Sequence, residues 1–150
     1  MKRYTALYAE FVGTFAMVFC GTAAMAVNET TGDVAHEGVA ITWGLIVMVM
    51  IYAFGSQSGA HFNPAVTTAF ALAKRFSWKK VPAYVITQIA AAVVASVAVK
   101  AIIPKSVIIG ATIPSIPHDS AFWLEFLLSF FLMIVILHIS TGSKEIGPVA

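Results

Sequence analysis

Charge is scarce in this sequence. Only 11% of its 150 residues are Asp, Glu, Lys or Arg, 59% are hydrophobic, and the mean hydropathy is +0.88. Soluble globular domains carry about twice this share of charged residues, so the composition excludes that class and indicates a membrane protein. One run of 18 residues, Gly38 to Gly55, has no formal charge at all.

Cysteine and catalytic patterns are also missing. Cys20 is the single cysteine, so an internal disulfide is excluded. The four histidines lack the spacing of metal ligands, and the sequence has no nucleophile–base pair, phosphate-binding loop or stripe of basic and aromatic residues. We therefore expect neither an enzyme nor a protein that binds a metal, a cofactor or nucleic acid.

What the sequence does have is long apolar stretches. Four are long enough, or nearly so, to cross a hydrocarbon core of ~30 Å, which takes about 20 helical residues. A fifth stretch, Pro64 to Ala73, is too short to span. The sequence thus predicts an all-α membrane protein with complete spans at Leu7 to Val27, Gly38 to Gly55, Val81 to Val99 and Ala121 to Leu137.

The first stretch has an alternative interpretation. Lys2 and Arg3 precede it, and Ala24-Met25-Ala26 fits the small-residue pattern of a signal-peptide cleavage site. Glu10 interrupts the apolar region, however, and three more spans follow, so a transmembrane helix is favoured.

The basic residues predict the orientation. With a cytoplasmic N-terminus, seven of the nine lie inside and the acidic loop 28–37 lies outside, as the positive-inside rule requires. The short stretch 64–73 must then enter and leave on the cytoplasmic side, so it is predicted to be re-entrant. The inside residues are Lys2, Arg3, Lys74, Arg75, Lys79, Lys80 and Lys144, and the outside ones are Lys100 and Lys105.

An internal repeat organises the chain. EFVGTF at residues 10–15 matches EFLLSF at residues 125–130, and a weaker echo pairs residues 38–40 with 148–150. Three spans separate the two copies of the longer motif. Because three is an odd number, the second copy enters the membrane upside down, which is the inverted-repeat plan of many membrane transport proteins.

The stretch SGAHFNPAVT, residues 58–67, predicts a helix that begins inside the membrane. Asn63 is a favoured N-cap and Pro64 a favoured first helical residue. A helix of ten residues is about 15 Å long, half the membrane thickness, so its N-terminus would lie near the bilayer midplane. The preceding segment 56–62 would then run without regular hydrogen bonding, which is tolerated only where protein buries it or it lines a watery cavity.

Backbone carbonyls of Gly59, Ala60 and His61 could then offer a ladder of acceptors to a passing molecule. The alternative is an ordinary cytoplasmic loop followed by an amphipathic surface helix. It is disfavoured because residues 64–73 have no charged face.

This stretch resembles the first signature loop of the major intrinsic protein family, the aquaporins and glycerol facilitators. The resemblance covers nearly the whole chain, including the Glu-bearing first and fourth helices and Tyr84-x-x-x-Gln88 in the third. It implies a bundle of six helices and two half-helices with one pore per subunit, assembled as a homotetramer.

The same resemblance implies residue roles. Asn63, of the Asn63-Pro64-Ala65 motif, would be one of two asparagines that hold a solute oxygen at the midplane. Hydrogen bonds made by Glu10, Gln88 and Glu125 would brace the signature loops. The alternative role for the three bracing residues is to join one helix to another.

Trp43 lies 20 residues before Asn63. In the family this spacing marks the second-helix residue of the outer constriction, where water-selective members usually carry Phe. Glycerol facilitators and the nodulin-like intrinsic proteins usually carry Trp, and residues 43–67 look closest to the nodulin-like group. A flat indole offers an apolar wall to an alkyl backbone. The alternative is a packing or lipid-facing Trp at the membrane interface.

The sequence departs from the family pattern in having no second Asn-Pro-Ala motif and no arginine after it. We interpret residues 1–150 as an incomplete channel domain, with a first repeat at 1–103 and the start of a second at 119–150. The expected function is a passive plasma-membrane channel subunit for water and small uncharged solutes such as glycerol, urea or metalloid acids, in contact with membrane lipid. The alternatives are a non-conducting truncated subunit and an ion-coupled secondary transporter.

Overall fold

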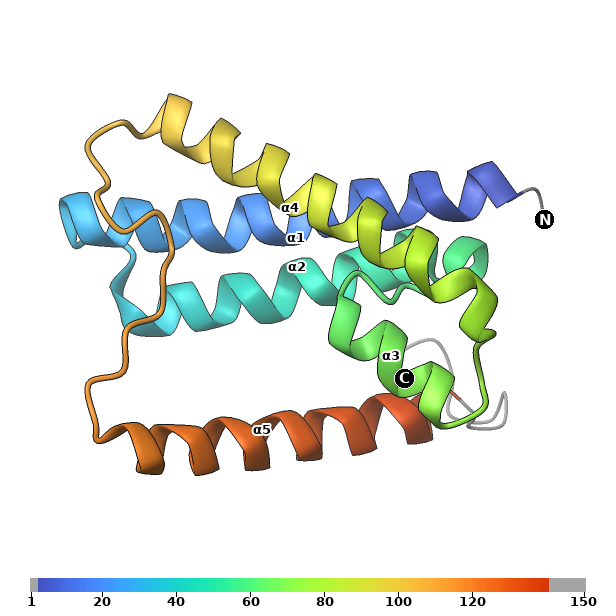
Figure 1. The fold of residues 1–150 in the computed structure, drawn as a ribbon. Coiled ribbons are helices and arrows are strands. Elements are labelled where there is room, and N and C mark those ends of the chain that lie inside the picture. Colours follow the sequence, from blue (N-terminus) through green and yellow to red (C-terminus); the bar gives the residue numbers. More distant parts are fainter. Residues whose placement is uncertain (1–2, 141–150) are drawn as a thin grey trace. The chain divides into compact units, whose positions relative to one another are not determined.

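A computed structural model describes residues 3–140 and shows helices joined by loops, with no strand in that range (Figure 1). The all-α fold class predicted from the sequence is therefore confirmed. Four of the helices are long and apolar enough to cross a membrane. In chain order the elements are α1 (Arg3–Thr31), α2 (Ala35–Ser58), α3 (Pro64–Leu72), the 3-10 helix η1 (Trp78–Lys80), α4 (Val81–Ile102) and α5 (His118–Ile139).

The four predicted spans lie within α1, α2, α4 and α5. One boundary was wrong, because the irregular segment predicted at 56–62 is shorter in the structure. Helix α2 continues through Ser58, and the amide of Gly59 still donates to the carbonyl of Gly55 at 2.9 Å. Small polar residues such as Ser56 remain helical because the backbone hydrogen bonds continue past the apolar run. The weaker repeat at 148–150 lies outside the described residues.

The chain divides into two compact units, residues 1–111 and 112–150. In the larger unit, α1 lies between α2 and α4 and packs against both, while the short helix α3 packs on α4 (Figure 1). The smaller unit contains α5. The central position of α1 makes its side chains the ones that can reach every other part of the larger unit.

Small residues let the helices of the larger unit approach closely. Ala9 and Ala26 of α1 and Ala91 and Ala95 of α4 are fully buried. Packing through small side chains is typical of helices in membranes, where lipid tails are as apolar as the side chains and close van der Waals contact drives association. The core is consequently thin, and much of the helix surface remains uncovered.

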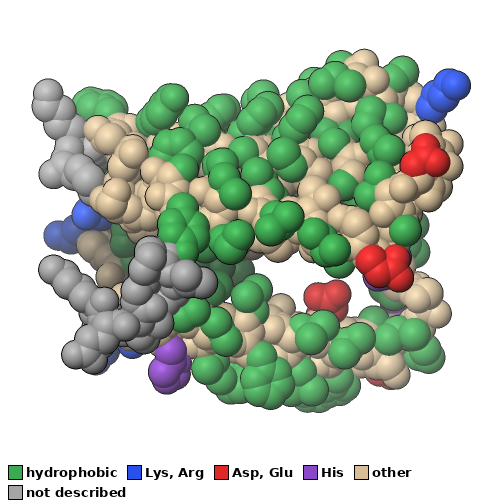
Figure 2. Space-filling model, turned by 180° about the vertical axis from the view of Figure 1, so that it is seen from behind, with side chains coloured by type: hydrophobic (Ala, Val, Ile, Leu, Met, Phe, Trp, Pro, Cys, Tyr) green, Lys and Arg blue, Asp and Glu red, His purple; other side chains and the backbone are tan. Residues whose placement is uncertain are grey.

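The uncovered surface is apolar. On the face that Figure 2 shows, hydrophobic side chains cover the flank of the larger unit, and charged side chains appear at its two ends. The apolar window of α2 has none of its residues buried, and Ile86 and Val97 of α4 are each more than 60% exposed. Such a band suits a hydrocarbon environment and would be a liability in water.

A carboxylate secures the end of α1 near Thr31. Glu29 accepts a hydrogen bond from the Ser106 hydroxyl at 2.6 Å and another from the Val107 amide at 3.0 Å. The Lys100 ammonium donates to the carbonyls of Pro104 and Ser106 at 3.0 and 2.8 Å. The loop that follows α4 is thereby held against α1, and Ser106 is fully buried.

Candidate functional site: the loop between α2 and α3

The chain turns sharply between α2 and α3. Gly59 has a φ of +90°, and Ala60 and Phe62 have φ values of +50° and +51°. Left-handed conformations are unfavourable for residues with a Cβ and persist only where surrounding contacts hold them. The amide of Ala60 donates to the Ser58 hydroxyl at 3.0 Å, which is one such contact.

Helix α3 begins where the sequence indicated. Asn63 is extended, with φ −149° and ψ 132°, and its Oδ1 accepts from the amide of Ala65 at 2.7 Å. Pro64 occupies the first turn, where its missing N–H leaves no donor unpaired. The Asn63 carbonyl accepts from both the amide and the hydroxyl of Thr67. Asn63 itself is exposed.

The carboxylate of Glu10 holds this loop from α1. Its Oε1 accepts from the amide of His61 at 3.0 Å, and its Oε2 accepts from the amide of Phe62 at 2.8 Å. The same Oε2 accepts from the Gln88 side-chain amide of α4 at 2.7 Å. Glu10 is fully buried, and both of its oxygens have donors, as a buried carboxylate requires.

Further polar contacts surround this carboxylate. The Thr14 hydroxyl donates to the Phe62 carbonyl at 3.1 Å, and Gln88 also donates to the Thr67 hydroxyl at 2.9 Å. The Tyr84 hydroxyl donates to the Ser58 carbonyl at 3.0 Å. The loop is thus bound by α1 on one side and by α4 on the other.

The carbonyl groups of the loop fall into two kinds. Those of Ser58, Phe62 and Asn63 each accept a hydrogen bond, from Tyr84, Thr14 and Thr67 respectively. Within residues 3–140, no hydrogen bond reaches the carbonyl oxygens of Gly59, Ala60 or His61. Within that range, three consecutive acceptors are therefore left without a protein partner directly before Phe62 and Asn63.

The side chain of His61 is structural. Its ring packs among Phe70, Phe76 and Tyr84, with ring centroids 4.7, 4.7 and 5.3 Å away. Its Nδ1 lies 3.1 Å from the Thr67 hydroxyl. Since the imidazole is enclosed in this aromatic cluster, only the backbone carbonyl of His61 can take part in an acceptor ladder.

Trp43 lies away from the loop, on α2. Its indole is half-buried and packs on Gly21 of α1. The Phe62 ring packs on Gly13 of the same helix, eight residues earlier, which corresponds to about 12 Å along α1. Trp43 and the loop are thus separated along α1, and the pore roles of Trp43 and Asn63 stay predictions.

Glu125 lies in the other unit. It is exposed on α5, and its side chain makes no hydrogen bond or ion pair with residues 112–140 of its own unit. It is the eighth residue of α5, just as Glu10 is the eighth of α1 as described. This agreement in position matches the repeat, and a bracing role for Glu125 stays a prediction.

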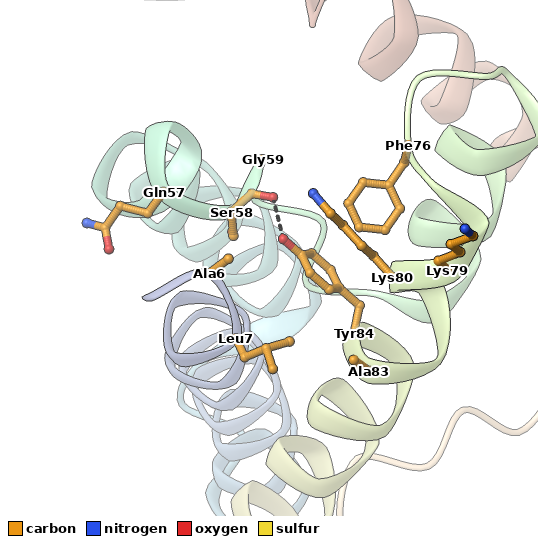
Figure 3. Close-up of a pocket in the computed structure, with 10 residues that line it drawn as sticks. All are labelled: Ala6, Leu7, Gln57, Ser58, Gly59, Phe76, Lys79, Lys80, Ala83 and Tyr84. Atoms are coloured by element: carbon orange, nitrogen blue, oxygen red, sulfur yellow. Dashed lines mark hydrogen bonds between the residues drawn. The ribbon is translucent and has the colours of Figure 1, made fainter. Parts of the chain in front are cut away.

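A cavity of about 610 Å³ lies beside the start of the loop (Figure 3). In Figure 3 the hydrogen bond from Tyr84 to Ser58 forms part of its wall. Of the residues predicted to form the solute path, Gly59 lines this cavity, whereas Ala60, His61, Asn63 and Trp43 do not. Its lining residues are Ala6, Leu7, Gln57, Ser58, Gly59, Phe76, Lys79, Lys80, Ala83 and Tyr84.

Comparison with known proteins decides the family. The model of the family described as Major intrinsic protein matches residues 1–148. This chain belongs to the major intrinsic protein family. It is 43% identical over 145 residues to Aquaporin NIP1-4 of Oryza sativa subsp. japonica, covering 96% of this chain and 53% of that protein. It is 45% identical over 151 residues to Aquaporin NIP6-1 of Arabidopsis thaliana, covering 100% and 50%.

The predicted resemblance to this family, and to its nodulin-like intrinsic proteins (the NIP type), is confirmed. The chain spans about half the length of these relatives. Family membership and four long apolar helices together make it an integral membrane protein.

Several residues of the site were not singled out from the sequence, among them Gly13, Thr14 and Thr67. The repeat held a signal for Thr14, because its position in EFVGTF is matched by the hydroxyl of Ser129 in EFLLSF. No such signal marked Gly13, since Leu128 stands at the matching place. Thr67 falls within SGAHFNPAVT, but only the fold shows that its hydroxyl contacts Gln88.

Glu10→Gln is expected to loosen the loop. The two carboxylate oxygens now accept hydrogen bonds from His61, Phe62 and Gln88. In the variant, an NH2 group replaces one of these oxygens, so at least one of the three donors loses its acceptor. Leaving a buried donor unpaired costs about 1–3 kcal/mol, so the free energy of unfolding should fall by that order. Reversible unfolding in mixed detergent micelles measures it, with the exposed Glu37→Gln as matched control. Equal stability of the two variants would contradict the bracing role.

Proposed function

We propose that this chain forms part of a passive membrane channel for water and small uncharged solutes. The observation that carries the proposal is the row of three carbonyls, at Gly59, Ala60 and His61, that have no partner within residues 3–140 and lead to the N-terminus of α3 at Asn63. Neutral acceptors followed by helix amides suit a solute that both donates and accepts hydrogen bonds. Family membership supports the same conclusion, because its members are channels and not enzymes.

The proposed path discriminates by charge as well as by hydrogen bonding. The N-terminus of α3 carries the positive end of a helix dipole, which disfavours cations and protons near Asn63. Asn63 keeps its side-chain oxygen on the amide of Ala65, which orients its own amide group. The NH2 of that group is then available to donate to a solute oxygen.

An ion-coupled transporter is disfavoured by the state of Glu10. Transporters place charged groups where ions bind, and Glu10 is the buried carboxylate nearest the loop. Both of its oxygens already accept hydrogen bonds from the protein, and the side chain is fully buried. Solute flux that is insensitive to proton and sodium gradients would support the channel, and gradient-driven accumulation would contradict it.

The proposed substrate class rests on Trp43. A half-buried indole whose other side packs on α1 offers a flat apolar wall to a carbon skeleton, while the polar loop meets hydroxyl groups. This favours glycerol, urea or a metalloid acid in addition to water. We further propose a homotetramer in the plasma membrane, as membership of the family suggests. A cytoplasmic N-terminus is also proposed, and the basic segment 74–80 and the acidic segment 29–37 support this orientation.

Flux is best measured in a conducting chimera. In it, residues 1–150 are followed by the part of Aquaporin NIP6-1 that lies beyond the matched region, since the match covers 50% of that protein. The chimera is reconstituted in proteoliposomes and studied by stopped-flow light scattering. The proposal predicts water and glycerol permeability, and a chimera that inserts but passes neither would contradict it.

Trp43→Phe in this chimera should lower glycerol flux more than water flux. The smaller ring changes the apolar wall that contacts the carbon backbone, while the loop at Asn63 is unchanged. Trp78→Phe is the matched control, because Trp78 is 55% exposed in η1. Equal loss of both fluxes would count against a filter role for Trp43.

Asn63→Asp should increase proton or cation leak without unfolding the protein. Aspartate caps helices as well as asparagine does, so the hydrogen bond from Ala65 is retained. The change replaces an amide donor with an acceptor and adds a negative charge that offsets the dipole of α3. Conductance across planar bilayers tests this, with the half-buried Asn28→Asp near the C-terminal end of α1 as control. Normal solute flux with unchanged ion conductance would remove Asn63 from the mechanism.

A further inference from the structure

The indole of Trp43 rests on a glycine of α1. A Cβ added to Gly21 would lie 2.3, 2.4 and 2.5 Å from its Cε2, Cζ2 and Cδ2 atoms. Cε2 and Cδ2 are the atoms shared by the two rings of the indole, so the middle of the ring system, and not its edge, covers Gly21. The space that a side chain would fill at position 21 is occupied by Trp43.

We propose that Gly21 is a selectivity-positioning residue: by seating the Trp43 indole against α1, it sets how far the indole extends into the solute path. This inference rests on the proposed function of Trp43 as a wall of that path. In this proposal α1 influences solute selectivity indirectly, through the position of Trp43, and not by contact between its own side chains and the solute.

The short distance between an added Cβ and the indole shows what a side chain at Gly21 would do. Ordinary van der Waals contact of a Cβ begins at 3.4 Å, whereas the nearest indole atom would be at 2.3 Å. The indole would have to move away from α1 by roughly 1 Å, because a rigid ring cannot bend and interiors are closely packed. In a hydrophobic pocket, one methylene group more or less on the substrate changes discrimination about 10–200-fold, so moving a wall by a similar distance should change selectivity measurably.

Close contact of this kind is not general among the glycines of the larger unit. A Cβ added to Gly55 of α2 would meet only Ile51, at 3.9 Å, and one added to Gly32 would have nothing within 4 Å beyond its chain neighbours. Gly13 resembles Gly21, because a Cβ there would lie 2.0 Å from Cε1 of Phe62. Two glycines of α1 therefore each provide the surface on which an aromatic ring packs, one ring on α2 and one in the loop. We call each of these glycine contacts a seat.

The two seats lie on one rigid helix. Gly13 and Gly21 are eight residues apart, about 12 Å along α1. Phe62 directly precedes Asn63, so the seat at Gly13 fixes the level of the loop, and the seat at Gly21 fixes the level of Trp43. Helix α1 thereby sets the separation between the two narrow points of the proposed path.

The seat itself is tested in the 150-residue chain. In a Trp78→Phe/Trp123→Phe background, Trp43 is the sole tryptophan and reports its own surroundings. Gly21→Ala should shift the fluorescence emission of Trp43 and change its quenching by acrylamide, whereas Gly55→Ala, farther along α2, should change neither. Identical spectra for Gly21→Ala and its parent would overturn the proposal, whatever the chain transports.

Selectivity is tested in the conducting chimera. Gly21→Ala should lower the ratio of glycerol to water permeability about tenfold, because the indole moves toward the path. Gly55→Ala should leave the ratio unchanged. In a Trp43→Phe background the smaller ring leaves room for a methyl group, so adding Gly21→Ala should change the ratio less than about twofold.

The outcomes separate the two proposals. A parent chimera that passes no solute contradicts the proposed function, while the fluorescence still decides whether the seat exists. Two outcomes in a conducting parent chimera would overturn the positioning role alone. In one, Gly21→Ala leaves the ratio of glycerol to water permeability unchanged. In the other, Gly21→Ala changes this ratio equally whether position 43 is Trp or Phe. If Gly21→Ala does not fold, recovery of folding by added Trp43→Phe supports the seat, and failure to recover overturns it.

Discussion

The structure of the larger unit depends on the two hydrogen bonds that the Glu10 carboxylate accepts from the amides of His61 and Phe62. Either partner alone would be unfavourable in an apolar bundle, since an unpaired carboxylate or an unpaired loop amide each costs several kcal/mol in such surroundings. Together they satisfy each other. An irregular segment can therefore lie among the helices and lead directly into α3.

Helix α1 is the element that carries this arrangement. From one helix, Glu10 and Thr14 bind the loop, and Gly13 and Gly21 receive the rings of Phe62 and Trp43. At its other end Glu29 holds the segment after α4. Because all these contacts are made by one helix, α1 fixes the distances between the loop, the Trp43 indole and the segment after α4.

The sequence predicted those features that depend on local pattern. The spans follow from apolar length, and the start of α3 follows from the capping chemistry of Asn63 and Pro64. The extent of α2 was predicted too short, because the polarity of Ser56 suggested that regular structure ends there, while backbone hydrogen bonding continues to Gly59. The glycine seats could not be predicted, since which ring meets which glycine depends on how α1 and α2 pack.

The most direct test of this account is whether the Glu10 carboxylate contacts the loop amides in a bilayer. Solid-state NMR can measure it as dipolar dephasing between 13Cδ-labelled glutamate and the 15N-labelled backbone amides of histidine. Hydrogen bonding at an N···O distance of 3.0 Å predicts strong dephasing at the His61 amide, lost in Glu10→Gln. Absence of dephasing in the unmodified chain would contradict the claim that α1 holds the loop.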